Sequence, residues 1–307
     1  MFRLICVLAI AGYAFAQCGN VIPGVETMTR GIDMVTGAQN STTGKTTLPI
    51  FEYHCTSGQK YVDPTNKSRV YDVPDELVVN QLSESVELVN DALMTSFSEF
   101  EEMRRSSFSI SVGVDFKKYN ASLDAKYDRE SYMFKEQIST KKKAAGFSRH
   151  WWSFYDLESY PPEMLTLNPM FERFLGLLPE KIHTMKDQHY YNQFIQYWGT
   201  HYPITANFGG RIHVDTTVDE SYFKSVSKSW VRQQFSLEFH WYLYDISSGG
   251  FTNKSDIHLN DKFKHAAQTY IYFRGGDALL QKNTTVGEWL PTVAEFPDFM
   301  NVTISDI

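Results

Sequence analysis

Apolar residues recur at three- and four-residue steps in three segments of the chain, which predicts amphipathic helices there. One segment covers residues 84–103; its apolar positions are Val86, Val89, Leu93, Phe97, Phe100 and Met103. Another follows the cap and first-turn pair Asn168-Pro169 and stops before Pro179. The third runs to Gly199, a residue that can take the left-handed conformation in which many helices end. We therefore expect each helix to pack on a larger core.

Other stretches alternate apolar and polar residues, the period of a β-strand with one wet face. After Pro203 the alternation runs to Val214, and Gly209-Gly210 interrupts it, where glycine marks a bend or a close backbone approach. Residues 107–116 alternate strictly over the length of one transmembrane strand, with apolar positions Phe108, Ile110, Val112, Val114 and Phe116. A third stretch has apolar positions Val231, Phe235, Leu237, Phe239, Trp241 and Leu243. The same period returns over 257–271, after turn residues at 247–250. Taken alone, residues 107–116 also suit an ordinary half-buried strand.

The helix that ends at Gly199 contains a recognisable motif. Tyr191 is followed, after six intervening residues, by Trp198 and then by Gly199-Thr200-His201-Tyr202. This order resembles the signature of the membrane attack complex/perforin (MACPF) family, which has Phe or Tyr where this chain has Trp198. Upstream, the Pro23-Gly24 turn and the Gly31-Ile32-Asp33 element resemble the entry into that family's domain. The alternative is that these residues serve packing and turns in an unrelated α+β domain.

The resemblance implies an α+β fold of the MACPF and cholesterol-dependent cytolysin type, with a bent central antiparallel sheet of about four long strands flanked by two helical clusters. It assigns the clusters to residues 108–155 and 218–270, which are small helices in the soluble form and amphipathic β-hairpins in the pore. The apolar positions given above for 107–116 and 231–243 would then face lipid. The glycines that would let the central strands bend or straighten are Gly209, Gly210, Gly275 and Gly276. Residues 270–277, with Trp289 and Pro291, resemble the last core strand and the closing segment of the domain.

The resemblance also implies a function. A lone β-hairpin cannot sit in a bilayer, because its edge N–H and C=O groups would lack partners, and only a closed barrel removes the edges. The chain is therefore expected to form rings or arcs on a target membrane and to need no cofactor. The alternative is a non-lytic extracellular binding or structural protein, which Lys117-Lys118 and the charged run 124–143 favour. Because relatives usually have a lipid- or glycan-binding module, a separate targeting chain, for example a lectin-like one, is a further expectation.

Residues 1–16 combine Arg3, an apolar run and the small-x-small site Ala14-Phe15-Ala16. This pattern predicts a secretory signal peptide followed by a secreted domain over 17–307. Removal of the peptide leaves Cys18 and Cys55, which suggests one disulfide in an oxidising compartment or, alternatively, bridges to another chain. Glycosylation sequons stand at Asn40, Asn66, Asn120, Asn253, Asn283 and Asn301.

Charge and motifs argue against several function classes. The formal net charge is -7, whereas nucleic acids and anionic lipid both attract clustered Lys and Arg. The sequence lacks a nucleophile elbow, a zinc-protease helix, a phosphate loop and a Cys-x-x-Cys pair, so we expect no enzyme. His201 is better explained as a structural histidine than as a base. His240, His258 and His265 lie in the second segment, where they either sense acid or occur by chance.

Overall fold

The computed structural model describes residues 18–33, 47–99, 136–247, 259–277 and 286–307, and only the backbone at 83–92, 241–247 and 301. Several sequence-based expectations lie outside the described residues. They are the signal peptide, the alternating stretch 107–116, residues 124–135 of the charged run, and the sequons Asn40, Asn120, Asn253 and Asn283.

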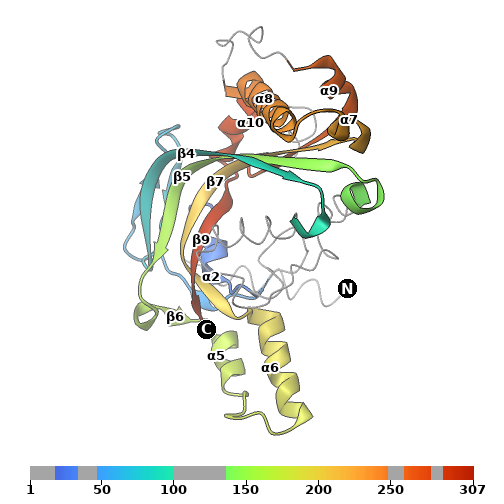
Figure 1. Cartoon of the computed structure of the whole chain (residues 1–307). Helices are drawn as coiled ribbons and strands as arrows, with labels where there is room; N and C mark the ends of the chain where they lie inside the picture. Colours follow the sequence, from blue (N-terminus) through green and yellow to red (C-terminus); the bar gives the residue numbers. More distant parts are fainter. Residues whose placement is uncertain (1–17, 34–46, 100–135, 248–258, 278–285) are drawn as a thin grey trace, which may run out of the picture.

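A bent antiparallel sheet organises the described part of the chain (Figure 1). Its strands are β4 (Leu77–Met94), β5 (Ala144–Ser159), β7 (His201–Val218), β8 (Ala267–Arg274) and β9 (Asp298–Asp306). The order is β4-β5-β7-β8, and β9 also pairs with β7. β9 pairs with residues 201–209 of β7 and β8 with 211–218, so these two shorter strands follow one another along one edge of β7. The expected fold class is confirmed, with five strands rather than about four. Residues 267–274 form the strand β8, but the last strand of the sheet is β9 and not the segment 270–277.

The prediction of a helix over 84–103 is wrong for its first half, because β4 continues as a strand to Met94. The pairing of β4 with β5 shifts register between Gln81 and Glu84 and again between Asn90 and Met94. Each irregularity changes which side chains share a face. Between the two shifts the pairing is regular, so Val86 and Val89 lie on opposite faces of β4, and apolar residues on both faces of a strand can mimic helical steps.

Helices lie at both ends of the sheet (Figure 1). Across the outer face of its upper arm lie α8 (Lys228–Ser247) and α10 (Val286–Val293), with α7 (Glu220–Ser225) and α9 (Asp261–Ala266) beside them. The short helix α2 (Val25–Thr29) packs on β7 lower down, and α5 (Pro169–Leu175) and α6 (Met185–Trp198) lie beyond the lower end of the sheet. Two small two-stranded sheets complete the lower part; they are β1 (Phe51–Glu52) with β6 (Thr166–Leu167), and the hairpin of β2 (Lys60–Val62) with β3 (Val70–Asp72).

The two predicted helices near the signature form where local signals place them. Asn168 caps α5 by accepting a hydrogen bond from Met170 N at 3.0 Å, and Pro169 opens its first turn. Thr184 and Asp187 form a capping box at the start of α6. Gly199 ends α6 with a φ of 80°.

The alternating residues 231–243 and 261–266 are helical here, within α8 and α9, and not strands. The family resemblance, which implies helices in the soluble form, thus describes this segment better than its period of two. Within the described residues, no helix is both long and apolar enough to cross a membrane.

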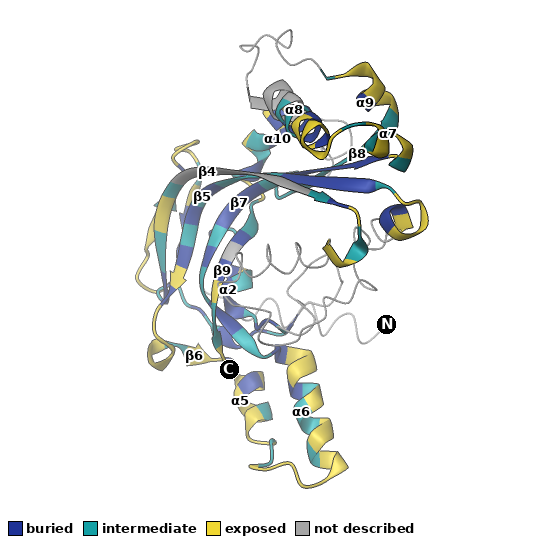
Figure 2. Cartoon of the chain, in the orientation of Figure 1, coloured by how far each residue is buried: buried dark blue, intermediate teal, exposed yellow. Residues whose placement is uncertain are grey.

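The largest apolar core fills the lower part of the domain around Tyr155, Leu157 and Phe208. A second core joins the upper arm of the sheet to α8 and α10 through Val214, Phe239 and Trp289. Figure 2 shows buried residues along the strands beneath these helices. The helices of the second segment are thus held mainly by side chains on one face.

Candidate functional site

The signature residues form a turn that is joined to the N-terminal Gly-x-Asp element. The Ile32 amide donates to the His201 carbonyl at 2.6 Å, and the Thr200 amide donates to the Ile32 carbonyl at 2.9 Å. A Cβ at Gly199 would lie 2.4 Å from the Ile32 carbonyl carbon, and one at Gly31 would lie 1.6 Å from the Trp198 carbonyl oxygen. Both positions therefore require glycine. Two motifs far apart in the sequence meet here.

The remaining signature side chains anchor this turn to its surroundings. Trp198 is buried, and its Nε1 donates to the Pro49 carbonyl at 3.2 Å. The hydroxyl of Tyr191 donates to the Pro179 carbonyl at 2.7 Å. Tyr202 is buried against Phe51, with ring centroids 5.2 Å apart. These contacts describe a structural motif.

His201 lies between Thr200 and the end of β9. Its Nδ1 is 2.7 Å from Thr200 Oγ1, and its Nε2 is 2.7 Å from the Asp306 carboxylate. Burial lowers the pKa of His201 and outweighs the nearby Asp306, which is mostly exposed and raises it. The ring is therefore neutral near pH 7 and bridges the signature turn to β9, a role consistent with the expected structural histidine.

The four candidate hinge glycines lie together at the bend of the sheet. A Cβ at Gly209 would lie 1.7 Å from the Trp152 carbonyl oxygen of β5, and one at Gly275 would lie 2.7 Å from the Gly209 carbonyl oxygen. Gly275 and Gly276 are turn residues after β8, with φ of 74° and 70°, and do not lie inside a strand. The backbones of β5, β7 and this turn therefore approach more closely than side chains would permit.

Trp289 of α10 fills the space that these glycines leave. It is fully buried, and its Nε1 donates to the Gly275 carbonyl at 2.8 Å. A Cβ added at Gly210 would lie 2.7 Å from the Trp289 ring, and a Cβ added at Gly276 would lie 2.3 Å from Trp289 Nε1. Sequence reasoning placed Trp289 only in the closing segment and missed this role, because nothing in its local spacing shows that it contacts the bend.

The apolar residues predicted to face lipid are used differently in the folded chain. Val231, Phe235 and Phe239 are buried on one face of α8 against the sheet, whereas Leu237 is half-buried. Gln234 and Glu238 are buried beside them, contrary to the wet face expected for a strand. Trp241 and Leu243 belong to the part of α8 where only the backbone is described. Of the histidines in this segment, His240 is half-buried, His265 is exposed, and His258 lies outside the described residues.

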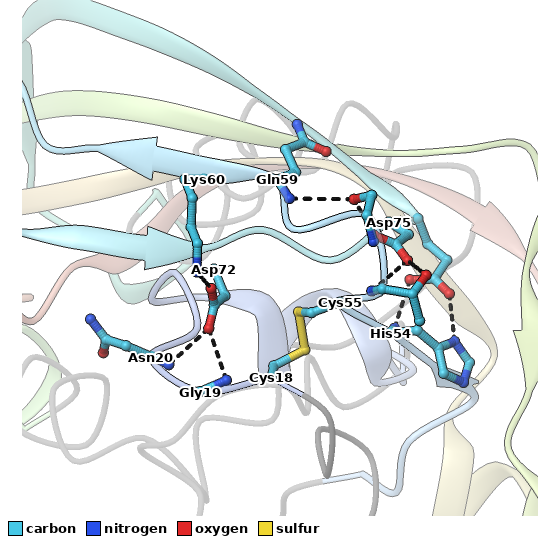
Figure 3. The surroundings of a disulfide bond; sticks show 12 residues. Cys18, Gly19, Asn20, His54, Cys55, Gln59, Lys60, Asp72 and Asp75 are labelled. Atoms are coloured by element: carbon cyan, nitrogen blue, oxygen red, sulfur yellow. Dashed lines mark hydrogen bonds and ion pairs between the residues drawn. A yellow bond between two sulfur atoms is a disulfide. The ribbon is translucent and has the colours of Figure 1, made fainter.

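The expected disulfide joins Cys18 to Cys55 and ties the N-terminal segment to the β2–β3 hairpin region (Figure 3). Next to it, the Asp72 carboxylate accepts hydrogen bonds from the amides of Gly19 at 2.8 Å and Asn20 at 3.1 Å, and pairs with Lys60. The hydrogen bond from Lys60, together with those from the Gly19 and Asn20 amides, lowers the pKa of Asp72. The N-terminal segment is thus held both covalently and by charge.

Of the sequon asparagines, two lie in the described part of the chain. Asn66 is exposed in the loop between β2 and β3, and its side-chain oxygen accepts hydrogen bonds from Ser68. Asn301 lies within β9, opposite Asn207 of β7. The loop position of Asn66 is the more accessible one for a glycan.

A cavity of about 740 Å³ opens beside the signature turn. Its walls come from α5, α6, the β1–β6 sheet and the end of β9, and include Phe171, Phe194 and the signature residues Tyr191 and Tyr202. Most of these side chains are apolar. Within the described residues, no group of three or more His, Cys, Asp or Glu side chains is placed to hold a metal ion.

The chain was compared with known families and proteins. The MAC/Perforin domain family model matches residues 19–307. The 67 kDa subunits of perivitellin-2 from Pomacea canaliculata and from Pomacea maculata are each 26% identical over 302 residues, which is 94% of this chain and 49% of each subunit. The chain thus spans about half the length of these curated relatives.

Among solved structures, GNIP1Aa from Chromobacterium piscinae superposes with a TM-score of 0.63 at 14% identity, covering 95% of this chain and 53% of that protein. This likeness supports the same fold. Together with the family match over nearly the whole sequence, it leads to one conclusion. The chain belongs to the MAC/Perforin domain family.

Proposed function

We propose that this chain is a secreted, non-enzymatic, perforin-like pore-forming protein that oligomerises on a target membrane and inserts two amphipathic β-hairpins. Its closed barrel would receive four strands from each subunit. The proposal rests on family membership and on one feature of the sheet, the common end of four strands.

These four ends lie side by side. Met94 of β4 pairs with Ala145 of β5, Ala144 pairs with Val218 of β7, and Val218 pairs with Ala267 of β8. Residues 95–143 connect β4 to β5, and 219–266 connect β7 to β8. Each connection therefore starts and finishes on neighbouring antiparallel strands, so extending the same ladders would turn both connections into hairpins of one continuous sheet.

The second connection is arranged so that it can leave the sheet. Its helices α7, α8 and α9 lie on the outer face of the sheet, and α8 packs across β4 and β5 as well as β7, mainly through one of its faces. Residues of that face, Val231, Phe235 and Phe239, would lie on the apolar side of a strand, while Arg232 and Ser236 would lie on its wet side. The segment thus suits a helix on the sheet and a strand in lipid.

A non-lytic extracellular role is the second candidate. Lys117-Lys118 and the sequon asparagines Asn120 and Asn253 lie inside the two segments, and a glycan cannot easily cross a bilayer. The relatives' description as subunits also favours a multi-chain assembly, in which a separate targeting chain selects the membrane. In such an assembly the MACPF chain would bind or support without inserting.

Release of a dye from liposomes, with electron microscopy of the same samples, tests the proposal. Vesicles of phosphatidylcholine, with and without cholesterol, and vesicles of whole-cell lipid extract provide a range of targets. We expect leakage together with rings or arcs on at least one composition. Intact vesicles without oligomers on all of them, from correctly folded protein, would count against pore formation by this chain alone and favour the second candidate.

A further inference from the structure

We propose that Glu238 is a positioning residue that fastens α8 to the ends of β7 and β8, and that it makes release of this helix easier at neutral pH than in acid. The inference rests on the proposed function for the consequence of release, but its structural part concerns the soluble protein alone.

The Glu238 carboxyl reaches across from α8 to two neighbouring strands. Its Oε2 is 2.6 Å from Thr216 Oγ1 of β7, and its Oε1 is 2.6 Å from Thr269 Oγ1 of β8. Thr216 and Thr269 are paired in register, two positions before the ladder ends at Val218 and Ala267. One side chain therefore joins the helix to both strands from which the second hairpin would extend.

Apolar groups surround this contact. Glu238 is only 7% exposed. Phe235 of the same helix packs over Gly146 of β5, and Phe239 packs against Val214 of β7. The even-numbered residues of β7 and the odd-numbered residues of β8 that face α8 are otherwise apolar; they are Ile212, Val214, Val218, Ala267, Ile271 and Phe273. Water is thus replaced by hydrocarbon on most sides of the carboxyl.

Charged and titratable groups on the packed elements lie around this apolar shell. They are His150 on β5, Arg232 and His240 on α8, Glu288 on α10, and the ion pair of Lys143 with Asp219 at the strand ends. α8 also packs on β4, whose backbone pairs with β5 and places Glu87 opposite His150. The second buried polar residue of α8, Gln234, accepts a hydrogen bond from the Asn260 amide at 2.9 Å and does not titrate.

The sign of the pH effect follows from the direction of the pKa change. Desolvation by burial raises the pKa of Glu238 above its ordinary 4.5, and the two hydroxyl hydrogen bonds oppose this only in part. A raised pKa means that the docked helix binds the proton more tightly than a released one. Docking is therefore strongest below about pH 4.5 and weakens as the pH rises through the raised value.

Release would place the same carboxyl in water. In the strand register, Glu238 shares the wet face with Arg232, Gln234 and Ser236. Its ionised form, which is disfavoured under α8, is the favoured form there. The side chain thus stabilises the docked helix as an acid and the inserted strand as an anion.

Hydrogen exchange of α8 in the full-length soluble protein, measured by mass spectrometry from pH 4 to pH 8 and corrected for intrinsic rates, tests the inference. In the wild type we expect the opening constant to rise from about pH 4.5 upward, by as much as tenfold per pH unit, and then to level off. In E238Q, an uncharged side chain of the same shape, we expect the acidic wild-type value at every pH. The control E220Q removes an exposed carboxylate of α7 and should keep the wild-type profile.

T269V provides an independent check, because it retains the carboxyl and removes one donor. It should increase opening several-fold at pH 8 and much less at pH 4. A flat wild-type profile, or the same pH dependence in E238Q and wild type, would overturn the inference. Because exchange is measured without lipid, a lack of liposome leakage would instead contradict the proposed function.

Discussion

The variants L237R and S236R each introduce one positive charge, at neighbouring positions of α8. We expect the two charges to have different effects only if α8 becomes a membrane strand. In the folded chain both residues are half-buried on α8 and border the same surface depression as Arg232 and Gln233. Substitutions at such surface positions usually change the free energy of unfolding by about 0.5 kcal/mol or less. Both variants should therefore be secreted and fold like the wild type.

The two variants should separate once the strand enters lipid. Leu237 then lies on the apolar face, where arginine near the bilayer midplane costs about 2 to 4 kcal/mol. Since about 1.4 kcal/mol corresponds to a factor of ten, insertion would weaken roughly 30- to 1000-fold for each subunit that carries the variant. Ser236 lies on the wet face, so S236R should leave insertion nearly unchanged and alter the conductance of the pore.

Dye release from liposomes measures insertion, planar-bilayer recording measures conductance, and thermal unfolding of the soluble proteins verifies that both variants are equally stable. The expected result is strong loss of leakage in L237R with leakage retained in S236R. Equal leakage by the two variants, at equal stability, would refute the strand register and the reasoning that assigns odd-numbered residues of this segment to lipid.

Three further predictions concern the soluble fold. G209A should lower the free energy of unfolding by about 3 kcal/mol or more, because its Cβ would overlap the Trp152 carbonyl. The control G176A, at a position with φ of -65° and no close neighbour, should change it little. Urea unfolding compares the two variants, and equal effects would contradict the close approach of the backbones at Gly209. W289F should cost about 1 to 3 kcal/mol by leaving the partly buried Gly275 carbonyl without its donor, while W230F removes a hydrogen bond at an exposed site and should cost less. Similar melting temperatures for the two would argue against the role given to Trp289. Mass mapping without reduction should recover a peptide pair joined by Cys18 and Cys55. The double variant C18S/C55S should lower the free energy of unfolding by about 3 to 4 kcal/mol, because the bond closes a loop of 37 residues. A peptide that joins either cysteine to another polypeptide would contradict the intrachain disulfide.

Local signals in the sequence predicted the elements that depend on local chemistry. Asn168 caps α5, Gly199 ends α6, and Gly209 marks a close backbone approach, since caps, turns and close approaches need particular residues at particular positions. The family signature then supplied the topology of the sheet. β4 was misread because its apolar residues lie on both faces of the strand, as Val86 and Val89 do, and no local signal distinguishes that arrangement from a helix.

The second segment shows why a pattern of period two did not decide between helix and strand. Val231, Phe235 and Phe239 recur every four residues, so they share one face of a helix and also one face of a strand. Glu238 reads as a wet-face residue in the sequence, and only the structure places Thr216 and Thr269 where they hold it. Trp289 was likewise missed, since its contacts with Gly210 and Gly276 join distant parts of the chain.

An environment-sensitive fluorophore on single cysteines introduced at positions 232 to 240 tests whether α8 refolds from a helix into a membrane strand. The two cysteines of the described chain are joined to each other, so an introduced cysteine can be labelled selectively. In solution the emission should vary with helical period, with the most apolar environments at positions 235 and 239. On liposomes we expect the emission to alternate from one position to the next. Fluorophores at odd-numbered positions should have blue-shifted emission and be quenched by lipid-borne quenchers, and those at even-numbered positions should be quenched by aqueous iodide. A helical period that persists on liposomes with bound protein, or no lipid-exposed position at all, would contradict the refolding of α8 into a strand.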